Sequence, residues 1–97
     1  MSCYRMIRSF RNRTTERFAG GGRSRFSGLD EQKARLRLDQ LNAAVTLQSM
    51  GALKSIGLHM LKGSRAGCWA VTINGPWRLV FRFVDGDAHD VEIVDYH

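Results

Sequence analysis

Apolar and polar positions alternate through the last third of the chain, which predicts three strands that each bury one face. The first apolar face is Trp69, Val71 and Ile73, the second is Trp77, Leu79, Phe81 and Phe83, and the third is His89, Val91 and Ile93. Turn-forming residues at 74–76 (Asn-Gly-Pro) and 85–87 (Asp-Gly-Asp) separate the strands. The pattern therefore predicts two consecutive hairpins of an antiparallel sheet.

The register of these hairpins follows from matching the apolar faces, because a slip of one residue moves every side chain to the opposite face. With three-residue loops the predicted pairs are Ile73–Trp77, Val71–Leu79, Phe81–Val91 and Leu79–Ile93. The other face then carries Thr72, Arg78, Val80, Arg82, Asp90, Glu92, Val94 and Tyr96. On this face we expect Arg82 opposite Asp90, and Arg78 diagonal to Tyr96 within reach of a shared site.

The first third of the chain predicts short elements. Residues 6–10 alternate in polarity and read as an edge strand, and residues 11–19 as one or two helical turns capped by Thr14 or Thr15. The triple glycine at 20–22 ends this helix and begins a basic loop that we expect to be mobile. It is poorly framed for a phosphate-binding loop, because no strand leads into it and no Lys-Ser/Thr follows.

Residues 29–50 predict one long helix, capped by Asp30 or Ser27 and stopped by Gly51. Its apolar residues form two stripes on nearly opposite sides. One stripe is Ala34, Leu38, Leu41 and Val45, and the other is Leu36, Ala43 and Leu47. We expect one stripe to pack on the sheet and the other on a neighbouring helix or a protein partner.

The composition bounds the class of protein. Ninety-seven residues allow one domain, with residues 1–5 as an extension before the first strand. No apolar run is long enough for a membrane span, and the first residues lack a secretory signal, so we expect a cytoplasmic protein. Two cysteines and three histidines without metal-ligand spacing predict no disulfide, no metal and no cofactor.

The net charge of +6 comes entirely from the first 28 residues, which hold seven arginines and one acid. The arginine side chain forms bidentate contacts with phosphate, so this front end suits a phosphate-rich partner. A solvated, solubilising surface is the alternative interpretation.

Five residues could carry chemistry. Arg78, in the middle of a strand, either forms an ion pair with an acid such as Glu92 or is available to bind an anion. His59 and Lys62 lie three apart in a predicted loop, and Tyr96 and His97 end the chain. Taken singly, each suits an ordinary surface or half-buried position. Together they offer the proton acceptor, cations and proton donor that RNA cleavage without a metal needs.

Three segments resemble the HigB branch of the RelE toxin superfamily: LHMLKGSRAG at 58–67, INGPWRLVF at 73–81 and VEIVDYH at 91–97. The MIRSF segment at 6–10 also resembles that family's first strand. The chain departs from the family pattern at Ser64, where many relatives have Asp, and at Cys68 and Ala70, which are often polar. The resemblance implies an α+β, RelE-like fold with helices on one face of a small, mainly antiparallel sheet.

The resemblance also implies a function. Such toxins enter the ribosomal A site and cut translated mRNA, and a HigA-like helix-turn-helix antitoxin neutralises them and binds operator DNA. By motif, the family's functional positions fall on His59, Lys62, Arg78, Tyr96 and His97. The arginines expected to contact RNA or the ribosome are Arg8, Arg11, Arg13, Arg23, Arg25 and Arg65. Two alternatives stay open: a noncatalytic RNA-binding or ribosome-associated protein, and an inactive homologue that retains antitoxin binding.

Overall fold

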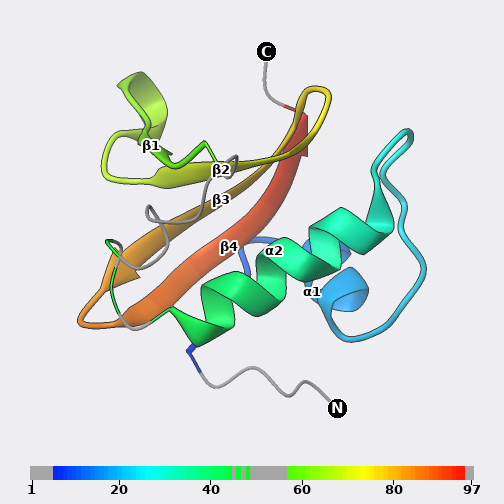
Figure 1. Ribbon diagram of the computed structural model, residues 1–97, viewed down its shortest axis with the longest axis horizontal. Helices are drawn as coiled ribbons and strands as arrows, with labels where there is room; N and C mark the ends of the chain where they lie inside the picture. The colour runs from blue at the N-terminus through cyan, green and yellow to red at the C-terminus, as the bar shows by residue number, and fades with distance from the viewer. Residues whose placement is uncertain (1–5, 45, 47, 49–56, 96–97) are drawn as a thin grey trace.

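The computed structural model describes residues 6–44, 46, 48 and 57–95, apart from the side chain of Arg65. The described part forms two helices, a short 3-10 helix and an antiparallel sheet in the order β1-β2-β3-β4 (Figure 1). The elements are α1 (Arg13–Ala19), α2 (Glu31–Ala43), β1 (His59–Met60), η1 (Gly63–Arg65), β2 (Trp69–Asn74), β3 (Trp77–Val84) and β4 (Asp87–Asp95). The predicted α+β class is confirmed.

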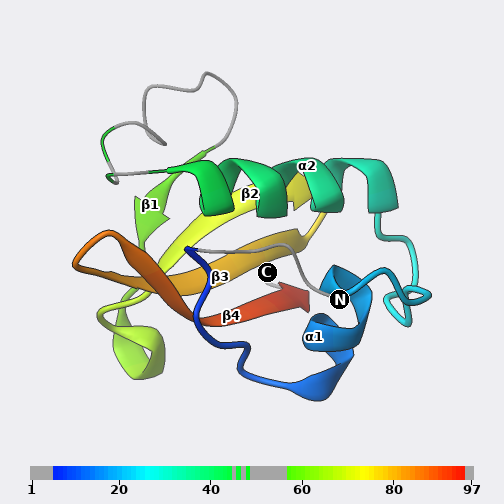
Figure 2. The same cartoon turned by 90° about the horizontal axis from the view of Figure 1, so that it is seen from below.

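Both helices pack on one face of the sheet. Figure 2 shows α2 lying across this face, with α1 beside β4. The core between them combines Phe18 of α1, Leu38 and Leu41 of α2, and the inward residues of the strands, among them Leu79 and Phe81. All five side chains are fully buried. The predicted apolar strand face is thus the face that the helices cover.

The long predicted helix is wrong in its extent. Asp30 caps α2 as expected, with its carboxylate accepting from the Lys33 N–H at 3.0 Å. The helix ends at Ala43, because Ala44 turns to an extended conformation and is buried in the core. Leu36, which belongs to the second apolar stripe, has 49% of its surface exposed, so the described residues do not cover this stripe. Val45, Leu47 and Gly51 lie outside the described residues.

The start of α1 also differs from the prediction. Asn12, rather than Thr14 or Thr15, is the N-cap, and its side-chain oxygen accepts from the Thr15 N–H at 2.9 Å. Thr15 is instead fully buried, and its hydroxyl accepts from the Ile93 N–H of β4 at 3.1 Å. The hydroxyl predicted to begin the helix therefore attaches it to the sheet.

Residues 6–11 run along the outer side of β4, in agreement with the predicted edge strand. The pairing is parallel and interrupted, through bridges at Ile7–Ala88 and Phe10–Val91. Backbone hydrogen bonds such as Arg8 N–H to Ala88 O at 2.7 Å hold the segment in place. The sheet is therefore antiparallel except along this edge.

The predicted register is correct in the body of both hairpins and wrong near the turns. Val71 pairs with Leu79, and Leu79 with Ile93, as predicted. The loops hold two residues instead of three, so Trp77 pairs with Asn74 rather than with Ile73. In the second turn Asp85 and Gly86 both have positive φ, which suits the type I′ turn that matches strand twist. Each tight turn shifts the register by one residue, and a bulge restores it.

The bulge in β4 changes the position of His89. Two residues, Asp90 and Val91, stand opposite Phe81, and Asp90 has a φ of 52°. Beyond this bulge Ala88 points into the core, and His89 pairs with Arg82 on the other face. The prediction that His89 lies on the apolar face is therefore wrong. No helix of the described residues has the length and apolar character to cross a membrane.

Candidate active site

The face of the sheet turned away from the helices carries two of the predicted catalytic residues. His59 pairs with Ala70, and Arg78 pairs with Thr72 and Val94. Directly paired residues share a face, so His59 and Arg78 lie on the same side of the sheet. From standard strand spacing and rise, their Cα atoms lie about 12 Å apart. The pairing thus places both residues on the open face of the sheet, two strands apart.

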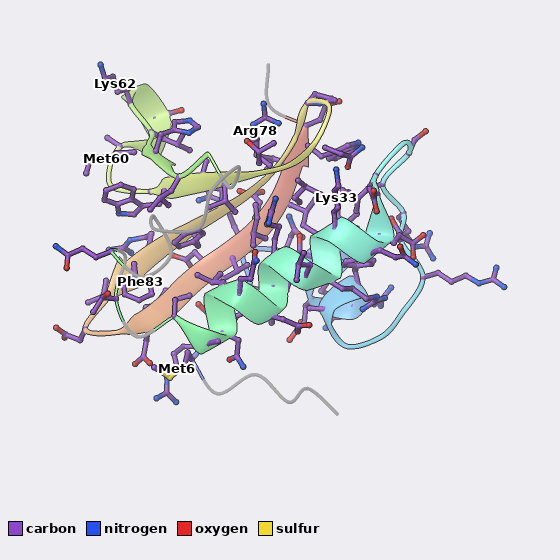
Figure 3. All side chains as sticks on the ribbon, viewed as in Figure 1. Met6, Lys33, Met60, Lys62, Arg78 and Phe83 are labelled. Carbon is purple, nitrogen blue, oxygen red and sulfur yellow. The ribbon has the colours of Figure 1, made fainter. Side chains whose placement is uncertain are left out.

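Arg78 is held by one of its nitrogens. Its Nη1 donates to Gly75 O at 2.6 Å and to Trp77 O at 3.0 Å. Within the described part of the chain, Nε and Nη2 carry no hydrogen bond and no carboxylate lies within ion-pair distance. The two carbonyls fix the guanidinium beside the β2–β3 turn (Figure 3) while two donor groups stay available for an anion.

Glu92, the acid considered as a partner for Arg78, lies elsewhere. It is 8% exposed, accepts from the Asn12 side chain at 3.4 Å, and forms an ion pair with Arg11 at 3.6 Å. This carboxylate joins the start of α1 to β4. The interpretation of Arg78 as one half of a structural pair with Glu92 is therefore wrong.

His59 lies on strand β1 rather than in the predicted loop. Its Nδ1 is 3.0 Å from Gly57 O. A carbonyl only accepts, so Nδ1 donates in this contact, and Nε2 is the ring nitrogen that remains for another partner. The ring is exposed. A backbone carbonyl thus orients the imidazole ring.

Gly57 supports this arrangement by its close approach to β2. It has a φ of +66°, and a Cβ built on it would lie 2.7 Å from the Thr72 hydroxyl. Thr72 pairs with Arg78. The backbone at Gly57, which orients His59, therefore lies against Thr72, and Thr72 is the strand partner of Arg78.

Lys62 lies on the segment between β1 and β2, which folds over the outer face. Leu61 is 3% exposed and packs with Cys68, Ala70 and Val80 in a second apolar cluster. The burial of Cys68 and Ala70 explains why these strand positions are apolar here. Lys62 itself is exposed, and Figure 3 shows it extending outward from η1 rather than toward Arg78. Tyr96 and His97 lie outside the described residues.

The predicted RNA-contacting arginines fall into different environments. Arg8 forms an ion pair with Asp87 at 3.2 Å, and Arg11 pairs with Glu92. Arg13 is exposed on α1, and Arg23 and Arg25 line a pocket beside this helix. Arg65 belongs to η1. The positive charge of the front end is therefore partly neutralised at the sheet edge and open around α1.

Sequence reasoning missed Gly57 and Thr72 as supports of His59, and it missed Thr14 and Arg17 as pocket residues. A glycine two positions before the histidine and a triple glycine followed by Arg-Ser-Arg were the available signals. In the described ranges, no three His, Cys, Asp or Glu side chains gather where they could hold a metal ion, and Cys68 is a buried free thiol.

Comparison with known proteins identifies the family. Residues 8–97 match the family described as RelE-like toxin of type II toxin-antitoxin system HigB. The chain belongs to the HigB family of RelE-like toxins. A protein named Endoribonuclease HigB from Proteus vulgaris is 35% identical to this HigB-like toxin over 94 residues, which are 95% of this chain and the whole of the relative. The family prediction is confirmed, and the relative's name agrees with the predicted enzyme class. Membership of a toxin-antitoxin family also implies an antitoxin partner.

Proposed function

We propose that this HigB-like toxin is an endoribonuclease that cuts mRNA in the ribosomal A site during translation. The observation that carries the proposal is the pair formed by His59 and Arg78 on the open face of the sheet. One offers a ring nitrogen oriented by a carbonyl, and the other offers two guanidinium nitrogens, Nε and Nη2, that bond to none of the described residues. The name of the Proteus vulgaris relative supports the same reaction class.

The proposed reaction needs no metal. The 2′-hydroxyl of the mRNA attacks the adjacent phosphorus, the bond to the 5′-oxygen breaks, and a cyclic phosphate forms. Arg78 and Lys62 stabilise the charge on the phosphate oxygens, and His59, Tyr96 and His97 share proton transfer and base stacking. The cytoplasm, where translated mRNA is present, is the proposed place of action, and a HigA-like antitoxin that binds operator DNA is the proposed partner.

Arg78→Ala tests this assignment, with Arg82→Ala as its matched control. Both arginines lie on β3 and on the same face, but Arg82 is paired with Asp90 at 3.7 Å. We expect Arg78→Ala to lower the cleavage rate by about 10²–10³-fold, as the loss of one transition-state donor does. Arg82→Ala should stay within about threefold of the wild type, since an exposed ion pair contributes little.

Cleavage is measured by primer extension on a message translated in vitro, with and without a chelator and with untranslated message as a third arm. New 5′ ends that need translation and survive the chelator support the proposal. A folded Arg78→Ala protein that cuts as fast as the wild type contradicts the site assignment. No new 5′ ends from the wild-type protein would favour a noncatalytic ribosome-associated protein, or an inactive toxin that still binds its antitoxin.

A further inference from the structure

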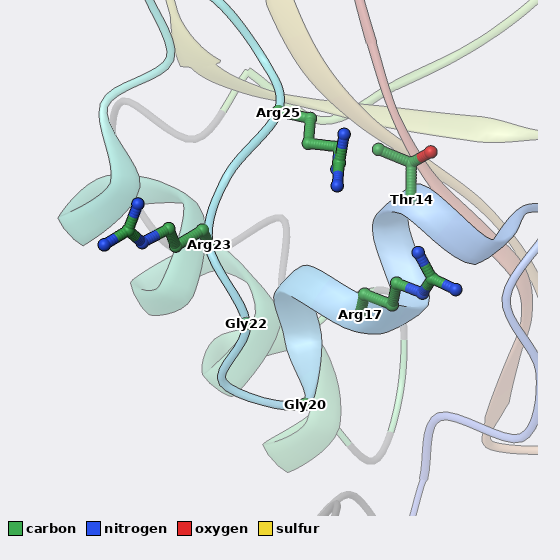
Figure 4. Close-up of a pocket in the computed structure, with 6 residues that line it drawn as sticks. All are labelled: Thr14, Arg17, Gly20, Gly22, Arg23 and Arg25. Carbon is green, nitrogen blue, oxygen red and sulfur yellow. The ribbon is translucent and has the colours of Figure 1, made fainter.

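We propose that the pocket between α1 and residues 20–25 binds a phosphate ester, as carried by an RNA strand or a free nucleotide. The pocket has a volume of about 380 Å³. Its lining residues combine cations, one hydroxyl and glycine backbone: Thr14, Arg17, Gly20, Gly22, Arg23 and Arg25. Figure 4 shows the Arg17 and Arg25 side chains directed to either side of Thr14, whereas Arg23 extends from the far side of the loop.

The described part of the chain does not neutralise the charge of the pocket. Arg17, Arg23 and Arg25 form no ion pair among the described residues, and no acid is among the residues that line the cavity. Arg8 and Arg11 of the same front end are paired with Asp87 and Glu92. Cations gathered around one cavity repel one another, and a bound anion removes this repulsion. Planar guanidinium groups beside a hydroxyl are suited to the oxygens of a phosphate.

The wall of the pocket is a loop that backbone hydrogen bonds hold against α1. The N–H groups of Gly20 and Gly22 donate to Glu16 O and Arg17 O at 3.0 and 2.8 Å. Gly22 lies so close to α1 that an added Cβ would be 2.7 Å from Arg17 O. A site that is already formed loses little conformational freedom when it binds its ligand.

Arg35 of α2 holds this loop from the other side. Its guanidinium donates to Phe18 O at 2.9 Å and to Gly22 O at 3.2 Å, and lies 4.2 Å above the Phe18 ring. This arginine satisfies carbonyls at the end of α1 and does not line the pocket. The carbonyl groups that would repel an anion are thus partly engaged by Arg35 and by the loop itself.

The pocket is separate from the proposed catalytic residues on β1 and η1. Figures 1 and 2 place the loop after α1 and the β1–η1 region at opposite sides of the molecule. The inference goes beyond the proposed function, because RNA cleavage at His59 and Arg78 does not require this pocket. A finding that the pocket does not bind phosphate would not affect the proposed cleavage residues. A finding that the protein does not cleave RNA would not affect the proposed pocket.

Binding is measured by fluorescence anisotropy with a labelled 2′-O-methyl oligoribonucleotide, which lacks the attacking hydroxyl and cannot be cut. We expect Arg17→Ala and Arg25→Ala in the full chain each to weaken binding about tenfold, as the loss of a charged phosphate contact does. Lys33→Ala is the matched control, since it removes one positive charge from an exposed side chain of α2 outside the pocket. It should weaken binding less than about threefold. Arg25→Lys should recover part of the affinity.

Two competitors identify the ligand. Displacement of the oligonucleotide by a nucleoside triphosphate, reduced in the same two variants, supports a free-nucleotide site, and resistance to it supports an RNA strand. Equal weakening of oligonucleotide binding in all three alanine variants would indicate a general effect of charge. It would overturn the proposal that the pocket binds phosphate. Displacement by an oligoglutamate of equal charge, as effective as the nucleoside triphosphate, would overturn the phosphate assignment in favour of an acidic polypeptide.

Discussion

Gly57 controls the position of a proposed catalytic side chain without having a side chain of its own. Its carbonyl orients His59, and its missing Cβ lets the backbone approach the Thr72 hydroxyl. Its positive φ adds a second reason for glycine. The chemistry proposed for His59 therefore depends on a residue that no search for reactive side chains would select.

Gly57→Ala should reduce RNA cleavage about tenfold or more while the protein stays folded, because residue 57 and Thr72 must move apart and the carbonyl that orients His59 moves with them. Gly67→Ala is the control. Gly67 also has a positive φ, of 90°, but an added Cβ would meet no atom within 4 Å. Both variants carry the conformational cost of about 1–2 kcal/mol for a side chain in this region. Equal cleavage rates in the two variants would show that Gly57 does not position His59.

At the scale of elements, α1 is attached to the sheet by polar contacts as well as by its apolar face. Thr15 bonds to the backbone of β4, and Asn12 both caps the helix and contacts Glu92. A helix of seven residues has little stability alone, so these contacts decide where it lies. The periodicity of its sequence indicated the helix but not this attachment.

Thr15→Val should lower the free energy of unfolding by about 1–3 kcal/mol, because it keeps the shape of the side chain and leaves the Ile93 N–H without its acceptor. Thr15→Ser keeps the oxygen and loses one buried methyl group, which costs about 1 kcal/mol. Urea denaturation of the two variants measures the difference. A valine variant more stable than the serine variant would show that this hydrogen bond contributes little.

At the scale of the whole molecule, the apolar alternation of the strands was enough to predict β2, β3 and β4, their buried face and most of their register, but not β1. It could not reveal the shift at each turn, because the two-residue turns and the bulges compensate for each other within one hairpin. It also could not reveal the end of α2, since Ala44 leaves the helix to enter the core and no glycine or proline marks the place. The placement of His59 and Arg78 on one face follows from pairing, whereas their proposed roles came from family resemblance.

The distribution of charge over the molecule gives a prediction of its own. Arg8→Ala and Arg25→Ala each remove one positive charge, but Arg8 is paired with Asp87 and Arg25 lines the pocket. We expect RNA affinity measured against salt concentration to have a slope smaller by about 0.7 in Arg25→Ala, as one lost phosphate contact requires for a single strand. The slope for Arg8→Ala should remain close to that of the wild type. Identical slopes would mean that total charge alone governs binding.

The attachment of residues 6–15 to β4 determines the order in which the chain can fold. Ser9 bonds to Asp90 and Thr15 to Ile93, across separations of 81 and 78 residues. The partners of the first segment are thus synthesised long after it, and closing so long a loop is slow compared with forming the local hairpins. During synthesis, the contacts of residues 6–15 with β4 cannot form until β4 has been made. The first segment and α1 can therefore reach their final positions only after β4 has been synthesised.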